Sequence, residues 1–118
     1  MPKTLTLFLT TTPYGFENNH TALRLAAAAL DRGYAVNLFA SGDGVHTFER
    51  GQQARGVPDA EKGFAALMGR GLHVELCGSC LTLRGIKPDD VLAGAEPSSM
   101  KRLFALMRAS DAFVTLGS

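Results

Sequence analysis

Residues 3–40 read KTLTLFLTTTPYGFENNHTALRLAAAALDRGYAVNLFA, and the order of their patterns indicates the fold class of the chain. Leu, Phe and Thr dominate residues 3–11, which predicts a first strand that ends at the turn around Pro13. An Ala- and Leu-rich helix follows and ends at Gly33, and residues 34–40 form a second strand. A strand, a helix and a strand in this order predict a right-handed crossover between parallel strands.

The rest of the chain continues this alternation. Helices are predicted to begin at residues that favour helix starts: Asn18 or Asn19, Asp59, Pro88, and Ser98 or Ser99. Further strands are predicted at residues 72–76 and 112–116, and a polar loop with one short helical turn at residues 45–57. We therefore expect one α/β domain over residues 1–118, a three-layer α/β/α fold with a mainly parallel sheet of four to five strands.

Composition and charge exclude several classes of function. A chain of 118 residues supports one hydrophobic core. Its 12 basic and 11 acidic residues give a net charge of +1, which leaves no overall field to attract nucleic acid or an anionic membrane. No apolar run approaches the roughly 20 residues of a membrane span, and the N-terminal residues alternate like a strand rather than a signal peptide. We expect a cytoplasmic protein without nucleic-acid or membrane partners.

Only two cysteines occur, Cys77 and Cys80, three positions apart. A disulfide framework would spread cysteines along a secreted chain, so an isolated C-x-x-C pair indicates redox, sulfur or metal chemistry in a reducing compartment. Cys77 directly follows the predicted strand 72–76, and reactive groups collect beyond the carboxyl ends of parallel strands. A thiol placed there near backbone N–H groups is favoured as the reactive thiolate. The plainer interpretation of Cys77, a small buried core residue, stays open.

Residues from other loops are expected around this thiol. Tyr14 and Gly15 follow the first strand and Gly44 follows the second, so we predict that three loops meet at Cys77 as a substrate-binding site. Gly78 allows close backbone approach, and Arg84 supplies a positive charge that favours an anionic thiol or persulfide.

The three histidines receive weaker predictions. His20 and His46 follow strand ends and are candidates to line the thiol pocket, although a surface role is the simpler interpretation for both. His73 begins a strand at the opposite edge and is expected to be structural.

The run Cys77-Gly78-Ser79-Cys80-Leu81-Thr82-Leu83-Arg84-Gly85 resembles the active-site segment of the DsrE/DsrF-like sulfur-relay family, which includes the TusD-type subunits. In that family a cysteine follows the third strand, and an Arg-Gly pair lies seven and eight residues later. Pro13-Tyr14-Gly15 and Gly44-Val45 agree with the family in register. This chain departs from the family at Ser79 and Cys80, where many members have Ala, and at Leu83, where many have Arg.

The resemblance implies a sulfur carrier or sulfurtransferase that accepts sulfane sulfur as a persulfide on Cys77 and passes it to a partner thiol. It implies sulfur donor and acceptor proteins or small sulfur compounds as partners, and a homo-oligomer, a trimer or hexamer. No metal or organic cofactor is needed for this chemistry. The second thiol, Cys80, could resolve a persulfide into a disulfide and release sulfide.

Other functions remain alternatives at this stage. A dithiol oxidoreductase would use Cys77 and Cys80, although the pair lies late in the chain and no Trp precedes it. A non-catalytic binding or interaction module of the same fold is the main alternative, because a fold does not determine a function. A zinc site would need about four ligands, and only the two cysteines and scattered histidines are available as N and S ligands.

Overall fold

Five parallel strands form one sheet in the computed structural model, which describes residues 3–15, 17–57 and 59–117. The strand order is β4-β3-β2-β1-β5. The strands are β1 (Thr4–Leu9), β2 (Ala35–Ala40), β3 (His73–Cys77), β4 (Glu96–Ser98) and β5 (Ala112–Leu116). The predicted parallel sheet is confirmed, with five strands.

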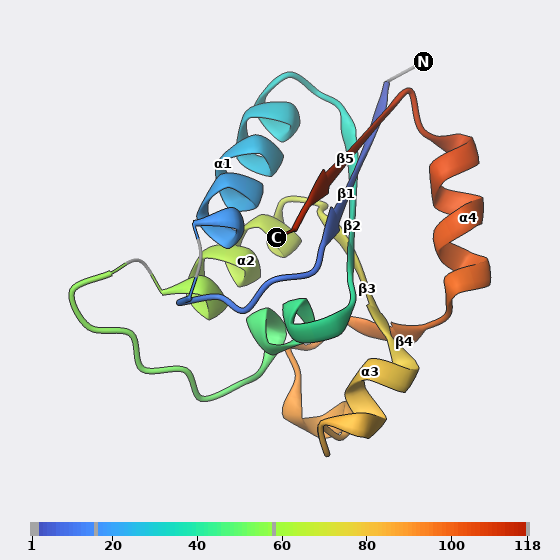
Figure 1. Cartoon of the computed structure of the whole chain (residues 1–118). Helices are drawn as coiled ribbons and strands as arrows, with labels where there is room; N and C mark the ends of the chain where they lie inside the picture. Colours follow the sequence, from blue (N-terminus) through green and yellow to red (C-terminus); the bar gives the residue numbers. More distant parts are fainter. Residues whose placement is uncertain (1–2, 16, 58, 118) are drawn as a thin grey trace.

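Helices cover both faces of this sheet (Figure 1). The helices α1 (Asn18–Asp31) and α2 (Ala60–Gly69) lie on one face, and α4 (Met100–Ala109) lies on the other. Shorter helices follow two of the strands, η1 (Gly42–Phe48) after β2 and α3 (Gly78–Leu83) after β3, and η2 (Pro88–Asp90) follows α3. The predicted three-layer α/β/α fold is confirmed.

Alternating side chains of the strands divide the core into two parts. In β3, Val74 and Leu76 point to the layer of α1 and α2, where most of the buried residues lie. Cys77 points to the opposite face and packs with Phe39, Leu103 and Leu106 in a smaller cluster beneath α4. The last residue of β3 is therefore part of the α4 layer.

Several local predictions are confirmed and others are wrong. The Asp59 carboxylate accepts a hydrogen bond from Lys62 N (3.0 Å), and Ser99 caps α4, as expected. The residue that caps α1 is Glu17, not Asn18 or Asn19, and no side chain accepts a capping hydrogen bond there. Asn19 is instead buried within α1 and hydrogen-bonded to Thr47, because it joins α1 to η1.

The edge strand β4 is attached to the sheet by a buried carboxylate. Glu75 of β3 accepts hydrogen bonds from Ser98 Oγ (2.6 Å) and from Arg102 Nε (3.0 Å), and it pairs with His73 Nε2 (2.6 Å). Burial opposes ionisation of this group, but the hydrogen bonds from Ser98, His73 and Arg102 outweigh it and hold the pKa of Glu75 below its ordinary value. One carboxylate thus connects β3, β4 and α4.

Replacing Glu75 by Gln should destabilise the fold by about 1–3 kcal/mol at neutral pH, because Ser98, His73 and Arg102 lose a charged acceptor that is itself buried. A carboxyl group whose pKa is lowered by folding stabilises the protein above its unfolded pKa, and this contribution disappears as the pH falls through the folded pKa. The difference between wild type and Glu75→Gln should therefore shrink as the pH falls below 4.5, the ordinary value. Urea unfolding at neutral pH and at about pH 3 measures this difference.

Glu96→Gln is the matched control, because Glu96 is exposed and pairs with Glu75 in the β3–β4 register. Its stability should stay close to that of the wild type at neutral pH. A Glu75→Gln protein as stable as Glu96→Gln would show that the carboxylate does not hold β4.

Candidate functional site

The two cysteines lie where β3 turns into α3. Cys77 is the last residue of β3 and the residue before α3, and Cys80 lies within the first turn of that helix. Both thiols are free. We call residues 77–85 the cysteine segment.

Cys77 is enclosed by the core. Its side chain is 6% exposed and packs beneath α4. The next residue, Gly78, lies close to the neighbouring edge strand, where an added Cβ would come within 3.1 Å of Ser98 O. Gly78 is therefore explained by the close approach of the β3 end to β4, and the interpretation of Cys77 as a buried residue fits its position.

Cys80 is half-buried, and its sulfur faces the loop that follows β2. Gly42 N donates a hydrogen bond to Cys80 Sγ (3.2 Å), and Ser41 Oγ lies 3.5 Å from the same sulfur. Burial raises the pKa of Cys80, but hydrogen bonds from Ser41, Cys77 and Gly42, together with the Arg84 charge, lower it below its ordinary value. The stabilisation of a thiolate expected at this strand end is therefore found at Cys80.

Arg84 connects the cysteine segment to η1. Its Nε and Nη2 donate to Asp43 Oδ1 (3.1 and 2.9 Å), and its Nη1 donates to the carbonyl oxygen of Cys80 (3.1 Å). The predicted positive charge is therefore near the thiol, but it is shared with a carboxylate. Its second effect is positional, because it ties α3 to the loop that carries Ser41 and Gly42.

Two glycines after β2, Gly42 and Gly44, are required for different structural reasons. Gly42 has a φ of +56°, a conformation that favours glycine, and this conformation accompanies the N–H group that bonds to Cys80. Sequence reasoning missed this residue, although the Gly-Asp-Gly turn at residues 42–44 was its signal. An added Cβ at Gly44 would overlap the carbonyl group of Leu9, so packing of η1 against β1 explains this glycine.

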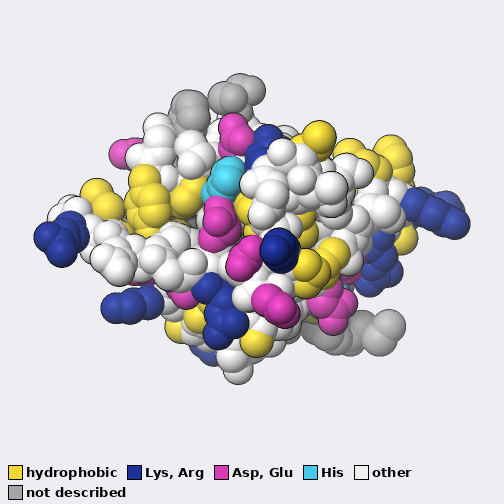
Figure 2. Space-filling view, turned by 90° about the horizontal axis from the view of Figure 1, so that it is seen from below, with side chains coloured by type: hydrophobic (Ala, Val, Ile, Leu, Met, Phe, Trp, Pro, Cys, Tyr) yellow, Lys and Arg dark blue, Asp and Glu magenta, His cyan; other side chains and the backbone are white. Residues whose placement is uncertain are grey.

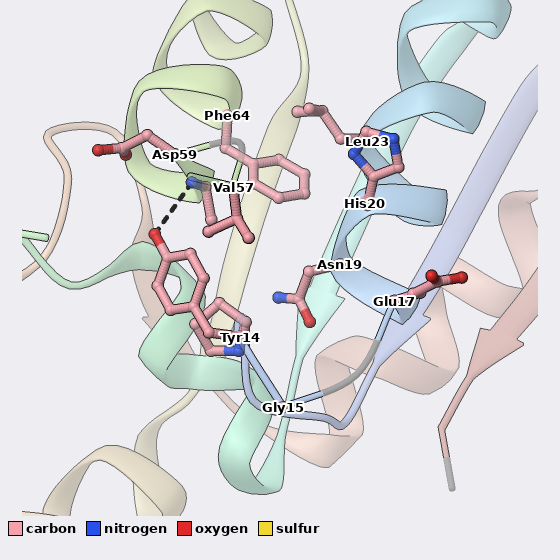
Figure 3. A pocket seen from close by; sticks show the side chains of 11 residues that line it. Tyr14, Gly15, Glu17, Asn19, His20, Leu23, Val57, Asp59 and Phe64 are labelled. Atoms are coloured by element: carbon pink, nitrogen blue, oxygen red, sulfur yellow. Dashed lines mark hydrogen bonds between the residues drawn. The ribbon is translucent and has the colours of Figure 1, made fainter. Parts of the chain in front are cut away.

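The loop after β1 lies elsewhere. Tyr14 OH donates to Gln52 Oε1 (2.6 Å) and accepts from Ala60 N (3.2 Å), the dashed line in Figure 3. Tyr14 and Gly15 line a cavity of about 470 Å³ beside α1 and α2, together with Phe64. The prediction that three loops meet at Cys77 is wrong for this loop, because the first turn directs Tyr14 toward α2. Only the loop after β2 reaches the cysteine segment through hydrogen bonds among the described residues.

None of the histidines is hydrogen-bonded to a thiol among the described residues. His20 lines the cavity beside α1, as Figure 3 shows, and His46 pairs with Glu49. His73 pairs with Glu75, in agreement with the structural role expected for it. In residues 3–15, 17–57 and 59–117, no group of three His, Cys, Asp or Glu side chains is placed to hold a metal ion.

The surface at the carboxyl ends of the strands is mixed in charge. Figure 2 shows this face, where acidic and basic side chains are interspersed with hydrophobic ones. A surface of this kind differs from the continuous basic patches that bind a phosphate backbone. None of the helices in the described part of the chain combines the length and apolar character needed to cross a membrane.

Replacing Ser41 by Ala should raise the pKa of Cys80, because one of the donors that favour its thiolate is lost. The midpoint of the pH dependence of Cys80 alkylation by iodoacetamide should therefore move to higher pH. The Cys77→Ser background leaves Cys80 as the only thiol to be read.

Ser79→Ala is the control for this experiment, since Ser79 is exposed in the same segment. Its midpoint should not move. If Ser41→Ala and Ser79→Ala have the same midpoint, the Ser41 hydroxyl does not stabilise the Cys80 thiolate.

Known proteins resemble this chain over nearly its whole length. It is 36% identical to the uncharacterized protein MJ0989 of Methanocaldococcus jannaschii over 93% of this chain and 96% of that protein. It is 34% identical to the uncharacterized protein MK0008 of Methanopyrus kandleri over 91% of this chain and 88% of that protein. The YchN protein of E. coli, known from a crystal structure, has a TM-score of 0.89 and 26% identity, with 98% of this chain and 99% of that chain covered.

A more distant structure shares the fold alone. MTH1491 of Methanobacterium thermoautotrophicum has a TM-score of 0.72 at 15% identity, and the match covers 97% of this chain and 99% of that chain. The model of the DsrE/DsrF-like family matches residues 3–116. These matches agree with the α/β sheet of this chain. The chain therefore belongs to the DsrE/DsrF-like family, which is associated with sulfur relay in general.

Proposed function

We propose that this chain is a sulfur carrier, which takes up sulfane sulfur as a persulfide on the cysteine segment and passes it to a partner thiol. The observation that carries this proposal is the arrangement around Cys80, where Gly42 N and Ser41 Oγ face a free thiol. Donors that stabilise a thiolate also suit the anion of a persulfide, because both place negative charge on sulfur. The family resemblance assigns the uptake of sulfur to Cys77.

The chemistry of a carrier is thiol exchange in both directions. A thiolate of the segment attacks the outer sulfur of a donor persulfide, which forms a new S–S bond and releases the donor thiolate. In the second step, the thiolate of an acceptor attacks the outer sulfur now held by the chain, and the thiolate of the segment is restored. The proposed cycle uses no metal or organic cofactor.

Partners and self-assembly are part of the proposal. Sulfur donor and acceptor proteins or small sulfur compounds would meet the chain at the carboxyl ends of the strands. On α4, Met100, Phe104 and Met107 are exposed at helical spacing. An apolar stripe of this kind supports the predicted homo-oligomer, in which another copy would cover it.

A dithiol oxidoreductase is the second candidate. The closeness of Cys77 and Cys80 at the end of β3 favours it, because two neighbouring free thiols can close a disulfide. This reaction would consume the pair instead of loading it with sulfur. Transfer of sulfur to another thiol separates the two candidates, since only the carrier hands on a sulfur atom.

Wild-type protein treated with sodium tetrasulfide and freed of excess reagent should gain sulfur in its intact mass. After addition of a peptide with one thiol, the peptide should gain sulfur while the chain loses it. The double variant Cys77→Ser/Cys80→Ser has no thiol and is the control, because it keeps nearly the same shape. A wild type that gains no sulfur, or that gains sulfur and never transfers it, would contradict the carrier function.

A further inference from the structure

The two thiols of the cysteine segment differ in how a sulfur donor can reach them. Cys77 is 6% exposed and lies beneath α4, in contact with Phe39 and Leu103. Cys80 is half-buried, and its sulfur faces the loop that follows β2. The rate of thiol exchange depends on access to the attacking sulfur, because the S–S bond of the donor must come into contact with it. Access therefore favours Cys80 as the sulfur that meets the donor.

The hydrogen bonds also converge on Cys80. Its sulfur faces the N–H group of Gly42 (3.2 Å), the hydroxyl of Ser41 (3.5 Å) and the thiol of Cys77. When Cys80 is a thiolate, Ser41 and Cys77 must act as donors toward it. The donors around its sulfur therefore favour Cys80 over Cys77 as the nucleophile.

We propose that Cys80 takes up the sulfane sulfur and that Cys77 is the resolving thiol, which closes a disulfide and releases hydrosulfide when no acceptor removes the sulfur. This inference rests on the proposed carrier function. It reverses the roles that the family resemblance implies for the two cysteines. It also assigns the uptake of sulfur to Cys80, a position at which this chain departs from many family members.

Each step balances in atoms and electrons. In uptake, the Cys80 thiolate attacks the outer sulfur of R–S–S–H, the donor S–S bond breaks, and Cys80–S–S–H and R–S⁻ are formed. In resolution, Cys77 passes its proton to the outer sulfur of Cys80–S–S⁻ and the resulting Cys77 thiolate attacks the inner sulfur. The S–S bond of the persulfide breaks, and the products are the Cys77–Cys80 disulfide and HS⁻. The proton of Cys77 leaves on the sulfide. The two cysteine sulfurs are oxidised, the outer sulfur is reduced, and a dithiol reductant restores the pair.

The single variants Cys77→Ser and Cys80→Ser separate the two roles. Reduced protein is treated with sodium tetrasulfide, freed of reagent and blocked with iodoacetamide, and the extra sulfur is located by fragmentation of the tryptic peptide that spans residues 71–84. In a parallel sample that is not blocked, the sulfide released after removal of the reagent is trapped with monobromobimane. Cys77→Ser should load at Cys80, keep its persulfide longer than wild type and release no sulfide. Cys80→Ser should load at least about tenfold more slowly, because its remaining thiol, Cys77, is enclosed beneath α4.

Two further variants guard against misfolding as the cause. Ser41→Ala leaves both thiols in place and should slow loading, whereas Ser79→Ala should load as the wild type does. Circular dichroism melts check that each variant is folded.

Three outcomes would count against these roles, and a fourth would contradict the carrier function. A Cys80→Ser protein that loads as fast as wild type, or extra sulfur found on Cys77 in the wild type, overturns the assignment and leaves the carrier function standing. Equal sulfide release by Cys77→Ser and wild type overturns the resolving role of Cys77. A wild type that takes up no sulfur contradicts the carrier function itself.

Discussion

The hydrogen bond from Gly42 N to Cys80 Sγ joins the loops that follow two neighbouring parallel strands. It exists because β2 and β3 run side by side in the same direction, so that both chains leave the sheet at one edge. An antiparallel arrangement would send one of these loops to the opposite edge. The site therefore depends on the order of the strands as much as on the residues of the C-x-x-C pair.

The alternation of side chains along β3 makes the two cysteines unequal. Cys77 has the same orientation as Glu75, toward α4, so it is enclosed by the cluster beneath that helix. Cys80 lies in the first turn of α3, beyond the end of the strand, and its sulfur meets the loop after β2. The pair combines an enclosed thiol with an accessible one, and the Arg84 contacts with Asp43 and the Cys80 carbonyl hold the accessible one beside η1.

The fold could be predicted from the sequence because the apolar residues of its longer strands and helices recur with clear periods. The strands β1, β2 and β3 carry apolar residues at alternating positions, and α1 carries an Ala- and Leu-rich face. The strand β4 was not located, because Glu-Pro-Ser has no strand pattern. This segment is a strand because the sheet edge and the buried Glu75 hold it there, which are tertiary effects.

The site was predicted only in part, for a similar reason. Local spacing indicated the end of β3, Arg84 and the importance of the two thiols. It could not show that Gly42, rather than Gly44, reaches a sulfur, because this depends on how η1 packs against β1. It placed Tyr14 and Gly15 at the thiol, whereas the turn after β1 directs them to the cavity beside α2. Turn residues in the sequence predict where a loop begins, but the direction of the loop depends on tertiary packing.

The central claim is that Cys80 is the reactive thiol of this chain, and competition between the two cysteines of the wild type tests it directly. Reduced protein receives less iodoacetamide than it has thiols, at neutral pH, and the label is located in the peptide spanning residues 71–84. If Cys80 is the reactive thiol, the label is found mainly on Cys80. Labelling mainly on Cys77 would contradict it.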